Sequence, residues 1–237
     1  SENLFGTSLK NVSVSLRRGE ILGIGGVAGN GQDELLAALS GEARSRRDSV
    51  ILEGKPIGHL GPLARRRLGL LAAPEERLGH AAAPDMSLTE NALLTGAVRE
   101  KLVKGGFVDW SGARAFADRV IERFDVRTPG AHVAARALSG GNLQKFVIGR
   151  EIMQRPGVLV VNQPTWGVDA SAAAAIRQAL IDHDFVKLFE MGAHFFLSLT
   201  IFIALYDEEY MQREGPLAFQ RHFAKELAHW EGKEYPS

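Results

Sequence analysis

A run of four apolar residues, Val158 to Val161, constrains the fold of this chain more than any other feature. A Pro156–Gly157 turn precedes the run. A strand that is apolar at every position is covered on both faces, and such strands are typical of parallel sheets flanked by helices. The run therefore predicts an α/β fold built around a mainly parallel sheet.

Strand and helix patterns alternate along the rest of the chain. The expected strands are 12–16, 20–24, 49–52 and 68–73, and the expected helices are 33–39, 87–96, 110–124, 142–154 and 169–181. The strand at 12–16 is expected to be half buried, because apolar and polar residues alternate there. Alternating strands and helices favour an α/β sheet. The helix-rich stretch 84–140 is interpreted as an inserted helical subdomain.

A glycine-rich loop joins the expected strand 20–24 to the expected helix 33–39. Its glycine spacing is that of a phosphate-binding loop, in which backbone N–H groups wrap a phosphate at a helix start. The usual pattern ends in Lys and then Ser or Thr, but this chain has Gln32 and Asp33 there. Gln32 cannot offset phosphate charge, and Asp33 would repel a phosphate. The candidate nucleotide-binding residues are Gly26, Gly29, Asn30, Gly31, Gln32 and Asp33.

Two other interpretations of this loop stay open. It could be a glycine-rich turn that binds nothing. It could also belong to a dinucleotide-dependent enzyme, since Gly23, Gly25 and Ala28 fit the G-x-G-x-x-A form of a dinucleotide site, with Asp48 or Glu53 as the acidic residue that follows.

The segment from Leu138 to Lys145, Leu-Ser-Gly-Gly-Asn-Leu-Gln-Lys, resembles the signature motif of ABC ATPases. Ser139 is expected to be the N-cap of the next helix, whose positive end would point at a phosphate. Gly140 and Gly141 would let the backbone approach a ligand closely, and Gln144 completes the candidate motif. A plain helix cap is the alternative.

The segment from Val158 to Asp169 resembles the Walker B strand and D-loop of the same family, with Asp169 at the D-loop position. The family normally has Asp and Glu where this chain has Asn162 and Gln163. That Asp helps to hold Mg²⁺, and that Glu polarises the attacking water. An amide carries no charge and cannot accept a proton, so the resemblance implies an impaired catalytic site.

Pro74 to Gly79 resembles the Q-loop segment of importer ATPases, and Glu75 stands where a Gln normally contacts the metal and the permease. The alternative for this segment is an ordinary surface turn. The resemblance covers residues 9 to 180, and is strongest to the second ABC domain of tandem ATPases that serve sugar or nucleoside importers. A P-loop NTPase core of the ABC type is the fold that this resemblance implies.

The resemblance also implies cofactors, partners and a location. The cofactors are ATP and Mg²⁺, and the partners are a first ABC domain and transmembrane permease subunits. The chain would lie at the cytoplasmic face of the membrane as a peripheral component. Its signature motif would serve the partner's ATP site, while its own site would bind ATP weakly. A structural or regulatory domain that binds no nucleotide is the alternative.

The amino-acid composition limits the kinds of partner and chemistry that the chain can have. Lys plus Arg and Asp plus Glu both total 28, a balance that argues against nucleic-acid binding. The chain has no cysteine, which excludes disulfides, thiol catalysis and cysteine-ligated zinc. The most apolar stretch, 193–206, is shorter than the ~20 residues that a membrane-spanning helix needs.

The ABC domain is expected to span residues 1–181. Residues 182–237 do not align with the family, and two interpretations have equal standing. In one, 192–199 is the next core strand, displaced along the chain. In the other, the whole segment is unrelated to the domain. His194 is interpreted as a packed strand residue in preference to the switch histidine of the family.

Overall fold

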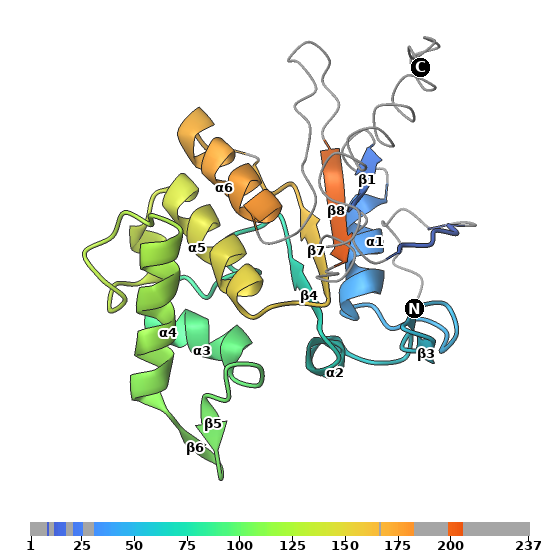
Figure 1. The fold of residues 1–237 in the computed structure, drawn as a ribbon, viewed down its shortest axis with the longest axis horizontal. Helices are drawn as coiled ribbons and strands as arrows, with labels where there is room; N and C mark the ends of the chain where they lie inside the picture. Colours follow the sequence, from blue (N-terminus) through green and yellow to red (C-terminus); the bar gives the residue numbers. More distant parts are fainter. Residues whose placement is uncertain are drawn as a thin grey trace.

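Four of the described strands form the central sheet. The computed structural model describes residues 9, 12–17, 21–25, 31–165, 167–182 and 199–205. Within these ranges the strand order is β1 (Ile21–Gly25), β8 (Leu199–Leu205), β7 (Val158–Asn162) and β4 (Leu70–Ala73). Figure 1 shows the sheet between α1 (Gln32–Ser40) on one side and α5 (Gly140–Met153) and α6 (Ala170–Asp182) on the other. The α/β prediction is confirmed.

Strand β7 is buried at every position, as its apolar run predicts. Leu159 and Val161 belong to the core that α3, α4, α5 and α6 share. Val158 and Val160 belong to a second core, together with Leu36 of α1. Successive side chains of a strand point to opposite faces, so the two cores cover the two faces of the sheet.

The strands do not all run in one direction. β4 and β7 pair in parallel, whereas β8 is antiparallel to both β1 and β7. Of the stretch 192–199, which is the next core strand in one of the two interpretations of the segment 182–237, the structure describes only Leu199, the first residue of β8. A strand that follows another through a helical crossover is usually parallel to it. β8 is antiparallel to β7, so it runs through the sheet in the opposite direction. His194 lies outside the described residues.

A helical subdomain lies beyond α5 in Figure 1. It consists of α3 (Leu88–Gly96), α4 (Trp110–Arg123), the 3-10 turn η1 (Ala135–Ala137) and the hairpin β5–β6 (Val103–Lys104 and Phe107–Val108). The capping box predicted at Ser87 and Glu90 is present at the start of α3. The hairpin was not predicted, although Gly105–Gly106 between its strands is a recognised turn signal.

A small peripheral layer completes the described fold. It contains the hairpin β2–β3 (Ile51–Leu52 and Lys55–Pro56) and α2 (Pro62–Arg67). The strand predicted at 12–16 is wrong, because residues 12–17 form no regular structure and both Val12 and Val14 are exposed. The alternation of apolar and polar residues predicts a strand, but it does not show whether a neighbouring strand is available to pair with it. None of the described helices combines the length and apolar character needed to cross a membrane.

Candidate functional site

The start of α1 follows the glycine-rich loop. Gly31 caps the helix in the left-handed conformation, with φ 107°, and no side chain caps its first turn. The side chain of Gln32 is buried, whereas Asp33 is exposed. Residues 26–30 lie outside the described part of the chain, so the contacts expected from Gly26, Gly29 and Asn30 remain predictions.

Asp33 lies beside the end of β7. The Asn162 side chain donates from Nδ2 to Asp33 Oδ1 at 3.0 Å. Asn162 itself is 1% exposed, and its Oδ1 has no hydrogen-bond partner among the described residues. The structure thus brings two predicted site residues together across 129 positions of sequence.

Glu75 joins this pair from the adjacent strand. It lies two residues beyond β4, and β4 runs parallel to β7, so both strands end at the same edge of the sheet. Burial and then the negative charge of Asp33 raise the pKa of Glu75, and the positive charge of Arg77 opposes them. We call Asp33, Glu75 and Asn162 the acidic cluster. Ligand sites in α/β proteins occur at this edge.

The donor set of the acidic cluster fits a hard divalent cation in part. Mg²⁺ prefers carboxylate, amide and water oxygens, and it is usually held by one or two carboxylates and by substrate phosphates. Asp33 and Glu75 supply carboxylates, and the unpartnered Asn162 Oδ1 supplies an amide oxygen. Among the described residues, no three His, Asp or Glu side chains are grouped to hold a metal. Water or phosphate would therefore have to complete the coordination.

Gln163 follows Asn162 directly and is only half-buried. Its backbone is in the left-handed region, with φ 48°. Non-glycine residues occupy this region uncommonly, and they cluster at functional sites. The neutral amide of Gln163 cannot act as a general base at this place.

The candidate signature motif lies at the exposed N-terminus of α5. Ser139 and Gly140 are exposed, while Leu138 packs partly buried against the core. Ser139 occupies the N-cap position, as predicted, but its hydroxyl caps no backbone group. That hydroxyl instead accepts a hydrogen bond from Asn142 Nδ2 at 2.9 Å. The first N–H groups of α5 are therefore not capped by Ser139, and the positive helix end faces outward.

The other signature residues face inward. A Cβ added at Gly141 would lie 3.1 Å from Ala172 Cβ and 3.3 Å from Asp169 Oδ2, so this glycine packs α5 tightly on the start of α6. Asp169 accepts from the Ala172 N–H at 2.9 Å, and that bond holds its pKa below the usual range. Gln144 is 1% exposed, and its side chain lies within the fold rather than at the exposed tip.

Sequence reasoning assigned no role to Arg77, yet this residue lies between Gly140 of the candidate signature motif and Gly167, two residues before the candidate D-loop residue Asp169. Its Nη1 donates to the Gly167 carbonyl at 3.5 Å. A Cβ added at Gly140 would lie 3.5 Å from the same nitrogen. The position of Arg77 in the Q-loop-like segment, two residues after Glu75, is the signal that could have singled it out.

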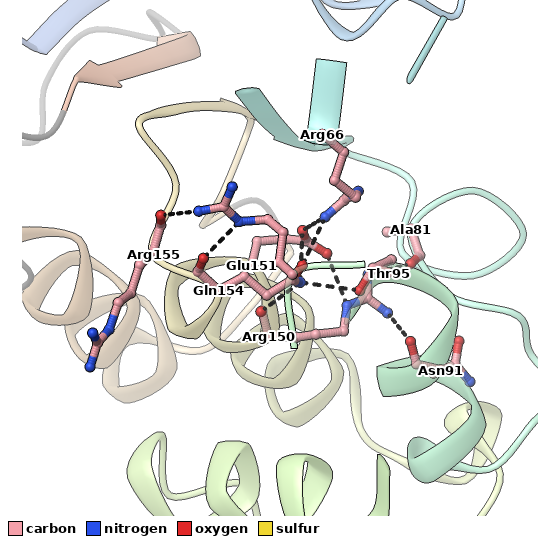
Figure 2. Close-up of polar contacts among 9 residues, drawn as sticks. Arg66, Ala81, Asn91, Thr95, Arg150, Glu151, Gln154 and Arg155 are labelled. Atoms are coloured by element: carbon pink, nitrogen blue, oxygen red, sulfur yellow. Dashed lines mark hydrogen bonds and ion pairs between the residues drawn. The ribbon is translucent and has the colours of Figure 1, made fainter. Parts of the chain in front are cut away.

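A buried polar network ties the far end of α5 to its surroundings (Figure 2). Glu151 accepts from Arg66 at 2.5 Å and from Arg150 Nε at 3.0 Å. Arg150 also donates to the carbonyls of Ala81, at 2.8 Å, and Asn91, at 3.1 Å. The network therefore joins α5 to α2, to α3 and to the loop that carries Arg77.

The structure does not support the dinucleotide interpretation. Gly23 and Gly25 both lie inside β1, not in a turn between strand and helix. Glu53 lies in the turn between β2 and β3, and Asp48 is an exposed partner of Arg46. A dinucleotide site needs its glycines in the strand-to-helix turn and its acidic residue on the ribose.

Residues 9–166 match the family model of the ABC transporter. Together with the sheet and the helical subdomain, this match shows that the chain belongs to the ABC transporter family of ATP-binding domains. Its relatives include the glucose import ATP-binding protein TsgD13 of Haloferax volcanii, which is 38% identical over 74% of this chain and 32% of that protein. The guanosine import ATP-binding protein NupO of Bacillus subtilis is 37% identical over 74% and 34%.

The chain is thus similar in sequence to ATP-binding proteins that are named for the import of a sugar or a nucleoside. The chain spans about a third of their length. Among solved structures, the dimeric ATP-binding cassette MJ0796, bound to ADP and Pi, matches with a TM-score of 0.60 at 20% identity. That match covers 74% of each chain and confirms the fold.

Proposed function

We propose that this chain is the second ATP-binding domain of a tandem importer ATPase for sugars or nucleosides. In this proposal it works with a first ABC domain and with permease subunits at the cytoplasmic face of the membrane. The names of its relatives support the substrate class. The closure of the two ATP-binding domains on ATP would be passed to the permease through the segment that contains Glu75.

The main role in this proposal is to donate the signature motif to the ATP site of the first domain. One observation carries it: Ser139 and Gly140 are exposed at an α5 N-terminus that no side chain caps. Two exposed residues at a positive helix end can approach the phosphate of a nucleotide held by another domain. Burial of this tip would have contradicted the proposal.

The chain's own ATP site is proposed to bind nucleotide weakly and to hydrolyse it slowly or not at all. Gln32 supplies no positive charge, Asp33 supplies a negative one, and Asn162 already hydrogen-bonds to Asp33. Gln163 cannot take a proton from water. The two sites of the assembly would thus be unequal.

A complex with a hydrolysis-competent first domain tests this asymmetry. Ser139→Arg should abolish ATP hydrolysis, because a bulky side chain then occupies the donated tip. Gln163→Ala should leave hydrolysis nearly intact, because the reaction takes place at the other site. Equal losses from the two variants would contradict the proposal.

A structural or regulatory domain that binds no nucleotide is the second candidate. The Asp33–Asn162 hydrogen bond favours it, since it places a carboxylate where a phosphate would approach. Isothermal titration of the chain with ATP and Mg²⁺ separates the candidates. Measurable binding supports a degenerate ATP site, and no heat at millimolar ATP supports the structural domain.

A further inference from the structure

An open pocket lies between the C-terminal ends of α4 and α5, at the end of α5 that is opposite the signature tip. Its volume is about 640 Å³. Small-molecule sites in proteins have volumes of about 300–1,000 Å³. The pocket is lined by Arg119, Glu122 and Arg123 of α4, by Ile152 and Met153 of α5, and by Arg155. None of these residues belongs to the candidate ATP site or to the signature motif.

Three arginines and a single glutamate line this pocket. Arg119 has local partners, because its Nη2 lies 3.2 Å from Glu100 Oε2 and its guanidinium lies 5.6 Å from the centroid of the Phe116 ring. Within the part of the chain that the structure describes, no ion pair or hydrogen bond engages the guanidinium groups of Arg123 and Arg155. Cations that face one cavity repel each other, so an anion bound there would stabilise them.

The ends of the two helices explain the presence of single arginines but not their convergence. A helix C-terminus attracts a cation. Arg123 is the last residue of α4, and Arg155 follows the end of α5 by two residues. Each side chain could serve its own helix end in many orientations. Both line the same pocket instead.

The backbone of Arg155 is in the left-handed region, with φ 51°. Glycine or asparagine is the usual residue in this conformation just after a helix, and non-glycine residues held in it cluster at functional sites. Arg99 fixes the turn, because it donates from Nε to the Gln154 carbonyl at 2.8 Å and from Nη2 to the Arg155 carbonyl at 2.5 Å. Figure 2 shows the Arg155 side chain pointing away from the buried network. The chain thus has an arginine where a glycine would be less strained.

The floor of the pocket is apolar. Ile152 is 1% exposed, and Met153 packs partly buried against the core. The thioether side chain of methionine adapts to ligands of different shape. A ligand that fills this pocket therefore contacts hydrocarbon below and guanidinium groups at the rim, which is the pattern of an anion with an apolar body.

A phosphate monoester fits the rim better than a carboxylate does. Guanidinium groups bind phosphate and carboxylate oxygens through charge-assisted hydrogen bonds. A phosphate monoester offers three acceptor oxygens and carries a charge of about −1.5 to −2 at neutral pH. Each of the three arginines can therefore face one oxygen, whereas a carboxylate offers only two.

We propose that this pocket binds a phosphate monoester with an apolar body. Arg119, Arg123 and Arg155 hold the phosphate, and Ile152 and Met153 contact the apolar part. The headgroup of a membrane lipid such as phosphatidic acid and a soluble phosphorylated metabolite share this chemistry. The site needs neither a partner domain nor ATP, so it stands apart from signature donation.

Isothermal titration of the full chain with n-octyl phosphate, below its micelle-forming concentration, tests the pocket. We expect one saturable site per chain. Inorganic phosphate should bind more weakly, because it gains nothing from the apolar floor. n-Octyl glucoside has the same hydrocarbon chain without the phosphate and should not bind.

Arg155→Gly and Arg123→Gln should each weaken the binding of octyl phosphate about tenfold or more, the size expected for the loss of a charge-assisted hydrogen bond. Arg155→Gly should not lower the melting temperature, because glycine suits the left-handed conformation. Arg114→Gln, at an exposed arginine of α4 that does not line the pocket, is the matched control and should leave the affinity unchanged.

Sedimentation with phosphatidylcholine vesicles, with and without phosphatidic acid, distinguishes the two sources of the ligand. Binding only to vesicles that contain phosphatidic acid identifies the lipid headgroup. Binding of octyl phosphate without vesicle binding identifies a soluble phosphate ester. Either result supports the pocket.

The proposal would be overturned if octyl phosphate did not bind saturably, or if octyl glucoside or inorganic phosphate bound equally well. An unchanged affinity in either Arg155→Gly or Arg123→Gln would also overturn it. None of these outcomes bears on signature donation, which Ser139→Arg tests in the complex.

Discussion

At the scale of single residues, two glycines of α5 have different tasks. Gly140 is exposed at the tip, and an added Cβ there would make only ordinary contacts, the nearest at 3.5 Å. Gly149 lies inside the subdomain, and an added Cβ would lie 2.5 Å from the ring of Phe124. The packing of α5 against Phe124 requires a glycine at position 149, whereas packing does not require one at position 140, where the proposed signature donation would use it.

Gly140→Ala should leave the melting temperature of the chain unchanged but impair ATP hydrolysis in the complex with a first domain. The new methyl group would hold a phosphate away from the backbone N–H groups, and a shift of about 1 Å can cost on the order of 10²-fold in rate. Thermal melting and steady-state ATPase measurements check both halves. Unchanged hydrolysis would show that the tip contacts no nucleotide.

For single residues, the sequence predicted the place in a helix better than the groups that the side chain contacts. It placed Ser139 at the N-cap, but the hydroxyl bonds to Asn142 rather than to the backbone. It did not single out Arg65, which is fully buried and donates to the carbonyls of Gly58, Leu60, Ala38 and Leu39. These partners come from two separate segments, the end of α1 and the loop before α2, and no local pattern shows such convergence.

At the scale of elements, α5 organises the molecule. It packs against α4 and α6, supports β4 from one face, and carries the signature tip at one end and the buried network at the other. Its helical pattern was predictable from sequence, with an error of two residues at its start. The direction of β8 was not predictable, because a short apolar strand fits a parallel or an antiparallel slot equally well.

Gly149→Ala should destabilise the chain by about 1–3 kcal/mol, because the Phe124 ring must move to admit the methyl group. The helix propensity of alanine, which favours the variant by about 1 kcal/mol, offsets part of this cost. Urea unfolding measures the difference, and Gly140→Ala in the same helix is the control. An increase in stability would show that α4 and α5 can move apart freely.

At the scale of the whole molecule, one buried carboxylate joins several parts of the chain. Burial alone would raise the pKa of Glu151, but Arg66 and Arg150 together hold it below its usual range. A carboxyl group whose pKa is lowered by folding stabilises the fold above its unfolded pKa, and this contribution is lost as the pH falls through the folded value. Glu151 therefore stabilises the molecule at neutral pH.

Glu151→Gln should destabilise the fold by about 3–5 kcal/mol at pH 7, because Arg150 is left buried without its charged partner. The difference between variant and unmodified chain should begin to shrink near pH 4, the usual range of a glutamate in the unfolded chain. It should shrink further as the pH falls towards the lower pKa of the folded Glu151. Chemical unfolding across pH 3–7 checks this, with the exposed Glu122→Gln as control. A difference that is constant with pH would rule out this account.

The loop after Glu75 has a mechanical consequence. Glu76 to Ala82 closes on itself through three backbone hydrogen bonds. Arg150 of α5 donates a hydrogen bond to the Ala81 carbonyl of this loop. Arg77 of the loop lies beside Gly140, the first residue of α5, and donates to the Gly167 carbonyl. The loop therefore contacts α5 near both ends of the helix. A displacement of the loop should tilt α5 as a rigid body instead of bending it.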